Sequence, residues 1–181
     1  MLTPGLWVRH FGGLQGRVSR KIANEMYVLL KTALAIAILN FDLASLSGVS
    51  YLVAWLLADV FINLAGYIFL RNFWQNPYSW NRSVLLILIN FIEYTAWFAC
   101  LYLSNEYLLF ESKTVTSAID ATYFSIVTAA TVGYGEITPA AGGRWLVTLE
   151  IVCSLFYMAT VVSYFVSNMS KVECDKDSGT P

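Results

Sequence analysis

The sequence has few charged side chains and a single histidine. Charged residues make up 13% of the 181 residues, and the formal net charge is −1, so nothing suggests a nucleic-acid partner. His10 has no visible nucleophile and base to work with, and an enzyme is therefore not expected. The three cysteines, Cys100, Cys153 and Cys174, fit no zinc-binding or redox spacing.

Regularly spaced basic residues are also absent from the apolar parts of the sequence. A voltage-sensing helix needs arginine or lysine at about every third position, so no such sensor is expected. The segment after the last apolar run, residues 169–181, is too short for a ligand-binding regulatory domain.

Hydrophobic residues are abundant, at 57% against roughly 45–50% in soluble domains. They gather in four runs, residues 26–46, 51–70, 84–104 and 145–167, each near the roughly 20 residues that cross a hydrocarbon core. Residues 117–130 are too short to span, and this length is typical of a re-entrant helix. The predicted fold class is therefore an all-α membrane protein with four transmembrane helices and a re-entrant helix.

The distribution of charge predicts the orientation of these helices. Basic residues gather in the N-terminal segment, residues 1–25, and between the second and third runs: Arg9, Arg17, Arg20, Lys21, Arg71 and Arg82. The positive-inside rule places both segments in the cytoplasm. Both termini are then cytoplasmic, residues 26–70 form a transmembrane hairpin, and residues 105–117 lie outside.

Residues 131–135, Thr-Val-Gly-Tyr-Gly, are identical to the known selectivity-filter string of potassium channels. A filter replaces the water shell of K⁺ with a ring of backbone carbonyls, which four chains can build around one axis. Successive carbonyls point inward only if some residues adopt the left-handed conformation, which glycine tolerates best, and Gly133 and Gly135 have the required spacing. Thr131 adds a hydroxyl oxygen, and Tyr134 has a ring that can wedge behind the strand.

The segment around this string resembles the pore loop of the tetrameric potassium-channel family, in residues 121–139. The resemblance implies a pore domain over residues 84–168, with an outer helix 84–104, a pore helix 117–130, a filter 131–135 and an inner helix 145–167. It implies K⁺ coordination by residues Thr131, Val132, Gly133 and Tyr134. It also implies filter support from Gly135, Glu136, Thr128, Tyr123, Phe124 and Glu150; ordinary helix packing is the alternative for the two aromatic residues.

The sequence departs from the family pattern at several positions. Ala130 replaces a common threonine, and Glu136 replaces the commoner aspartate beside the filter. Cys153 and Ser154 stand where many members have a glycine hinge, so bending of the inner helix at a glycine is not expected. Only one filter is present, and ring closure then needs four chains, a homotetramer.

Four ionisable residues lie within the predicted spans: Lys31, Asp59, Glu93 and Glu150. Each is costly in lipid and therefore needs a reason. Lys31 is close enough to the membrane surface to extend its ammonium group into water, and pairing with Asp59 is the alternative. Packing roles are expected for Glu93 and Glu150, with proton sensing left open.

One face of the last run carries Leu155, Met158, Val162 and Val166 at helical spacing. This face could line the pore as a hydrophobic gate or pack on the outer helix. Taken together, the sequence predicts a homotetrameric potassium-selective channel in the plasma (inner) membrane, with K⁺ as its permeant ion. Two alternatives remain: a cation channel of relaxed selectivity and a non-conducting membrane assembly subunit.

Overall fold

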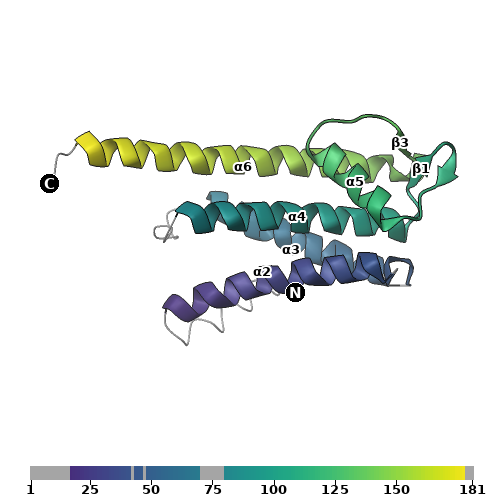
Figure 1. Cartoon of the computed structure of the whole chain (residues 1–181), viewed down its shortest axis with the longest axis horizontal. Coiled ribbons are helices and arrows are strands. Elements are labelled where there is room, and N and C mark those ends of the chain that lie inside the picture. The colour runs from purple at the N-terminus through teal and green to yellow at the C-terminus, as the bar shows by residue number, and fades with distance from the viewer. Residues whose placement is uncertain (1–16, 42, 47, 70–79, 178–181) are drawn as a thin grey trace.

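A computed structural model describes residues 17–41, 43–46, 48–69 and 80–177. Four long helices run lengthwise beside one another (Figure 1). They are α2 (Arg17–Asn40), α3 (Val49–Phe69), α4 (Trp80–Ser104) and α6 (Arg144–Asp177). A shorter helix, α5 (Ala118–Ala129), lies at one end of this bundle, beside α6.

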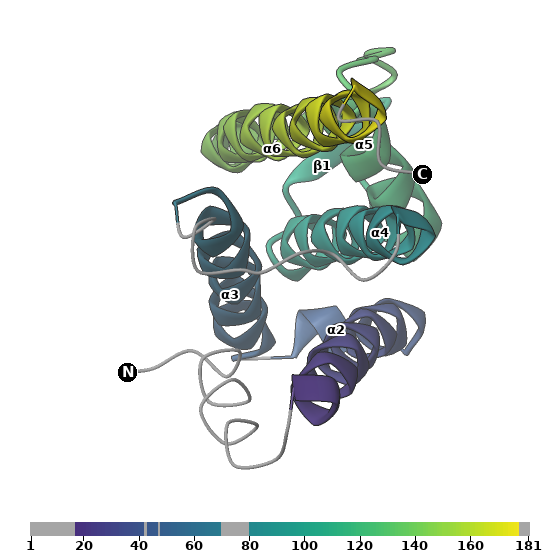
Figure 2. The ribbon, with the colours of Figure 1, turned by 90° about the vertical axis from the view of Figure 1, so that its left-hand side faces the viewer.

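Helix α4 occupies the centre of the molecule (Figure 2). It contacts α2 and α3 on one side and α5 on the other. The α4 side chains from Glu93 to Tyr102 are all buried, and four of them are aromatic: Tyr94, Trp97, Phe98 and Tyr102. An α-helix that is buried all round needs apolar residues on every face, which explains the continuous run in this part of the sequence.

Helices α2 and α3 form a hairpin whose turn contains a short 3-10 helix, η2 (Leu43–Ser45). The expected first run reached residue 46, whereas α2 ends at Asn40. There the Asn40 side chain donates a hydrogen bond to the carbonyl of Ile36, 2.9 Å away. Gly48, with φ of +94°, reverses the chain before α3 begins, a conformation that favours glycine.

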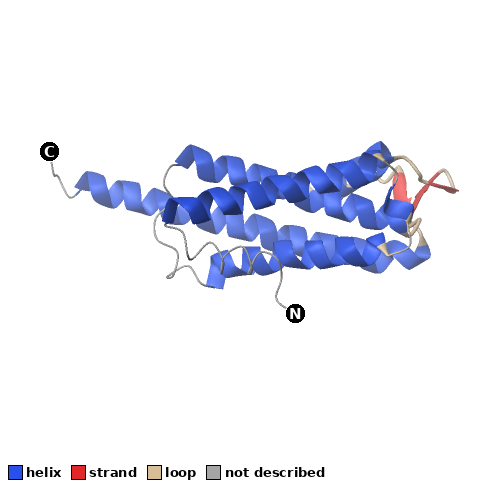
Figure 3. Cartoon of the chain, turned by 90° about the horizontal axis from the view of Figure 1, so that it is seen from below, coloured by secondary structure: helices blue, strands red, loops and turns tan. Residues whose placement is uncertain are grey.

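A small antiparallel sheet lies at the same end as α5 (Figure 3, red). Its strands are β1 (Leu108–Phe110), β2 (Lys113–Thr114) and β3 (Ile137–Pro139), in the order β2-β1-β3. The sequence prediction of an all-α chain missed this sheet. Strands of two or three residues are too short to show the alternating pattern that identifies a strand in a sequence.

Among the described residues, two helical segments are long and apolar enough to cross a membrane, Ile87–Ser104 and Ala141–Ser163. The apolar parts of the hairpin helices are shorter in this description, Met26–Asn40 and Val49–Ile62. His10, Arg9 and Arg71, which entered the predicted orientation or the case against an enzyme, lie outside the described residues.

Candidate functional site

The filter string follows α5 directly and has an alternating backbone. Thr131, Gly133 and Gly135 have positive φ values of 58°, 58° and 84°. Every second residue therefore has a positive φ, which is the sign that a strand needs if its successive carbonyls are to face one side. Two of the three are glycines, whereas Thr131 is β-branched and strained in this conformation.

The end of α5 holds the strained start of the string. The amide of Thr131 donates to the carbonyl of Thr128 at 3.0 Å, and that of Val132 to the carbonyl of Val127 at 2.9 Å. The hydroxyl of Ser154 on α6 donates to the carbonyl of Ala129, so α6 fixes the last turn of α5. These bonds supply the surrounding structure that a strained residue requires.

Glu136, at the other end of the string, accepts a hydrogen bond from the hydroxyl of Tyr123 on α5. This hydrogen bond raises the pKa of Tyr123 to about 12. The neighbouring Phe124 points elsewhere: it is buried, and its ring lies edge-on to that of Tyr102, with centroids 5.2 Å apart. Tyr123 therefore contacts the loop that follows residues 131–135, whereas Phe124 packs on α4.

Glu150 joins three helices behind this loop. Its carboxylate accepts from the hydroxyl of Tyr102 on α4 at 2.5 Å and from that of Ser125 on α5, and its side chain is fully buried. The Ser125 hydroxyl also lies 2.9 Å from the carbonyl oxygen of Thr95, and Tyr94 donates to the Glu150 carbonyl at 2.8 Å. A buried carboxyl with several partners stabilises one arrangement of the elements that carry them.

Sequence reasoning identified Glu150 but missed its partners, since hydroxyl groups in apolar helices are common and usually bond their own helix. The hydroxyls of Ser125 and Ser154 instead reach a second helix. The only available signal was their position, one on each side of the filter in sequence and within apolar runs.

Helix α6 presents two different stripes. Its buried stripe, Leu146, Glu150, Ser154 and Tyr157, faces the rest of the chain. The four residues of the predicted gate, Leu155, Met158, Val162 and Val166, are all exposed, between 43% and 61%. Val132 and Tyr134 in the filter string are also exposed, and a pocket of about 370 Å³ lies between this string, α5 and α6. Apolar surface of this extent on one chain indicates a surface that contacts something else.

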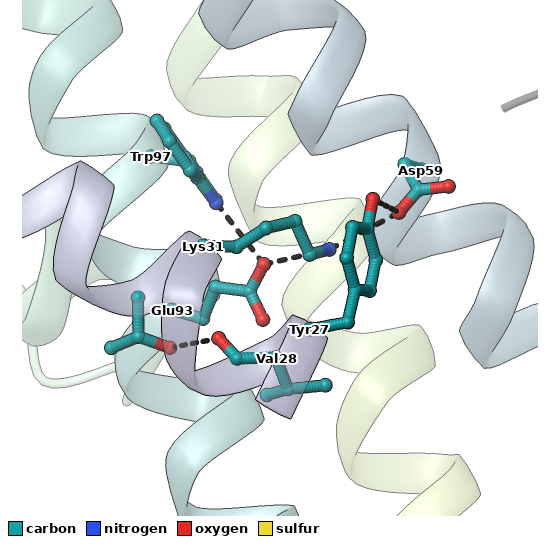
Figure 4. A network of polar contacts seen from close by, with 7 residues as sticks. Tyr27, Val28, Lys31, Asp59, Glu93 and Trp97 are labelled. Atoms are coloured by element: carbon teal, nitrogen blue, oxygen red, sulfur yellow. Dashed lines mark hydrogen bonds and ion pairs between the residues drawn. The ribbon is translucent and has the colours of Figure 1, made fainter. Parts of the chain in front are cut away.

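A second polar cluster lies between the hairpin and α4 (Figure 4). The Lys31 ammonium is 3.1 Å from Asp59 Oδ2 and 2.8 Å from Glu93 Oε1. Tyr27 donates to Asp59 at 2.9 Å, and the Trp97 indole donates to Glu93 at 3.3 Å. The prediction that Lys31 extends its ammonium to the membrane surface is therefore wrong, because the side chain is buried and paired with residues of two other helices. The alternative, pairing with Asp59, is confirmed.

Residues 84–171 match the family model described as "Ion channel". This segment covers α4 from residue 84, α5, the filter string and most of α6, and it excludes the hairpin of α2 and α3. No solved structure matches the chain.

Two curated relatives are named as potassium channels. The chain is 32% identical over 94 residues to the inward rectifier potassium channel Kirbac3.1 of Paramagnetospirillum magnetotacticum, a match covering 51% of this chain and 32% of the relative. It is 39% identical over 54 residues to a putative potassium channel protein of Rhodopseudomonas palustris, covering 29% of this chain and 13% of the relative. The chain thus spans a third or less of the relatives' length. Together with the apolar helices, these matches support the interpretation that the chain is a membrane protein and an ion channel of the potassium-channel kind.

Proposed function

We propose that this chain is one subunit of a homotetrameric channel that conducts K⁺ passively and selectively across the plasma (inner) membrane. The single observation that carries the proposal is the filter string in its alternating backbone conformation. Positive φ at Thr131, Gly133 and Gly135 suits a strand whose carbonyls all face one axis. The carbonyls of Thr131, Val132, Gly133 and Tyr134 would coordinate the dehydrated ion.

The position of α5 supports a cation site at the same place. The helix has 12 residues, and its C-terminal end carries a partial negative charge from the aligned peptide dipoles. That end lies at Ala129, directly before the filter string. Four such ends around an axis would favour a cation near the middle of the membrane, where an ion is otherwise costly.

The tetramer is proposed because one chain cannot form a ring of carbonyls. The exposed apolar stripe of α6 and the exposed Val132 and Tyr134 provide surface for neighbouring subunits or for the pore. In this arrangement Gly135, Glu136, Thr128, Tyr123, Phe124 and Glu150 support the filter. The termini are proposed to be cytoplasmic and the β1–β2 hairpin to lie outside.

The test is ion flux into liposomes that contain the purified protein. A selective filter predicts K⁺ uptake far above Na⁺ uptake under matched gradients. Equal uptake of the two ions would favour a cation channel of relaxed selectivity. Absence of flux in a folded tetramer would favour the non-conducting assembly subunit.

A further inference from the structure

The β1–β2 hairpin is hydrogen-bonded to the chain that leaves the filter. Strand β1 pairs with β3 in antiparallel register, with Leu108 opposite Pro139, Leu109 opposite Thr138 and Phe110 opposite Ile137. Strand β3 begins at Ile137, directly after Glu136 and the last filter glycine. A segment that is far from the filter in the sequence therefore holds the residues that follow it.

This sheet is anchored in the protein core and is not a free loop. Leu108 of β1 and Ile137 of β3 are both buried, at 1% and 8% exposure. The amide of Ala140 donates to the carbonyl of Tyr107 at 2.7 Å, which extends the pairing beyond β3. Burial of apolar side chains from both strands resists their separation.

The filter string is consequently held at both ends. At one end the amides of Thr131 and Val132 bond to carbonyls of α5. At the other end Glu136 accepts from Tyr123, and β3 pairs with β1. The residues of a binding site keep their geometry when rigid elements support them, and a shift of a fraction of an ångström in their positions is enough to loosen the site.

We propose that residues 107–115, through their pairing with β3, position the outer end of the filter and determine how well it keeps its conducting geometry. Tyr107 and Leu109 would position the outer end of the filter without belonging to it. The inference depends on the proposed channel function and adds to it a structural control at the outer mouth.

Gly143 provides a direct way to disturb this contact. A Cβ at Gly143 would lie 2.7 Å from Tyr107 Cβ and 2.8 Å from the Tyr107 carbonyl oxygen, so the hairpin would have to move. The adjacent Gly142 is a matched control, because its Cβ would meet Tyr107 only at 3.4 Å, against the ring. Gly143→Ala should therefore displace Tyr107 and the β1–β2 hairpin, and Gly142→Ala should not.

Leu109 provides an independent second pair of variants. The carbonyl of Leu108 accepts from Val115 on the β2 side, whereas that of Tyr107 accepts from Ala140 on the β3 side. Backbone groups alternate sides along a strand, so the Leu109 amide points to β3. Leu109→Pro removes this donor, and Leu109→Ala retains it.

The experiment compares these four variants with the wild type in liposomes and measures two properties. The first is the initial ratio of K⁺ to Na⁺ flux; the second is the fraction of channels that stop conducting after external K⁺ is removed. Loss of one hydrogen bond corresponds to a shift of about fivefold in such an equilibrium. We expect Leu109→Pro to raise the ratio of non-conducting to conducting channels by about this factor and Gly143→Ala to raise it in the same direction, with both control variants near the wild type.

If the β1–β2 hairpin only stabilises the fold, Gly143→Ala and Leu109→Pro should lower the melting temperature or the tetramer yield and leave both flux properties unchanged. Wild-type flux properties in assembled Gly143→Ala and Leu109→Pro would overturn the inference while the proposed channel function stood. If Leu109→Pro does not assemble, the comparison of Gly143→Ala with Gly142→Ala decides. A wild-type protein that carries no K⁺ would refute the proposed function and this inference with it.

Discussion

Lys31 Nζ in α2 lies 2.8 Å from Glu93 Oε1 in α4, and both side chains are buried. The same ammonium lies 3.1 Å from Asp59 in α3, so a single cation joins both helices of the hairpin to the central helix. The family match begins at residue 84 and does not include the hairpin. The ion pairs thus connect the part of the chain covered by the ion-channel match to the hairpin that precedes it.

We expect Lys31→Met to destabilise the protein strongly, because it leaves two buried carboxylates without their shared cation. Removal of one partner of a buried ion pair costs about 3–5 kcal/mol. Chemical unfolding of the detergent-solubilised protein measures this cost. Lys113→Met is the control, since Lys113 is exposed on β2, and its loss should change the free energy of unfolding little. Equal stability of the two variants would contradict the role assigned to Lys31.

We expect Glu150→Ala to be more damaging than Glu150→Gln. Alanine leaves the buried hydroxyl of Tyr102 without its acceptor, while Ser125 keeps only the carbonyl of Thr95; glutamine retains an oxygen and a nitrogen where the carboxylate lay. Each buried polar group left unsatisfied costs about 1–3 kcal/mol. Thermal unfolding of the two variants measures the difference. If both melt like the wild type, Glu150 does not hold α4, α5 and α6 together.

We expect Gly133→Ala to weaken the preference for K⁺ through backbone strain and not through a clash. A Cβ at Gly133 meets no atom within 4 Å in the chain, but φ is +58°. The left-handed conformation costs a residue with a Cβ about 1–2 kcal/mol. The ratio of K⁺ to Na⁺ flux in liposomes reports the effect, with Gly142→Ala as the control. Retention of the wild-type ratio would contradict the filter geometry assigned here.

The sequence predicted the local features of this protein better than its long-range contacts. The two glycines at the required spacing indicated left-handed backbone, and both adopt it. The positive φ of Thr131 was not predicted, because no sequence pattern marks a strained threonine. It depends on the hydrogen bonds that α5 supplies after folding.

Contacts between helices were harder to predict for a physical reason. The prediction for Lys31 used its distance from the end of one apolar run, which favours extension toward water, and gave pairing with Asp59 only as the alternative. In the structure Asp59 and Glu93, at distant sequence positions, offer the ammonium two buried partners instead. The sheet was missed for a similar reason, since β1 and β3 are defined by pairing between residues far apart in the chain.

The proposed topology predicts the side from which two cysteines react. Ser112 is exposed in the turn between β1 and β2, and a Ser112→Cys variant should react with an impermeant reagent from outside. The native Cys174 should react only from inside, because both termini are proposed to be cytoplasmic. Labelling in sealed, oriented vesicles measures both, with Cys174→Ser as the control for the second position. Reaction of both cysteines from one side would overturn the four-span arrangement.

The last prediction concerns the exposed stripe of α6. Leu155, Met158, Val162 and Val166 are exposed in the chain, whereas Glu150, Ser154 and Tyr157, on another face of the helix, are buried. If the exposed stripe lines the pore, its apolar side chains can narrow the pore enough to exclude water, and this closes it. Met158→Ala and Val166→Ser should then raise the open probability by making the constriction wider or more polar.

Single-channel recording in planar bilayers measures this open probability together with the preference for K⁺. The preference should stay unchanged, because neither residue belongs to the filter. Leu88→Ala is the control, since Leu88 is an equally exposed apolar residue on α4, outside the proposed pore. Unchanged gating in both α6 variants, together with a pH response that Glu150→Gln abolishes, would move the gate to the hydrogen-bonded region behind the filter. In that case the exposed stripe would instead be a contact with neighbouring subunits or lipid.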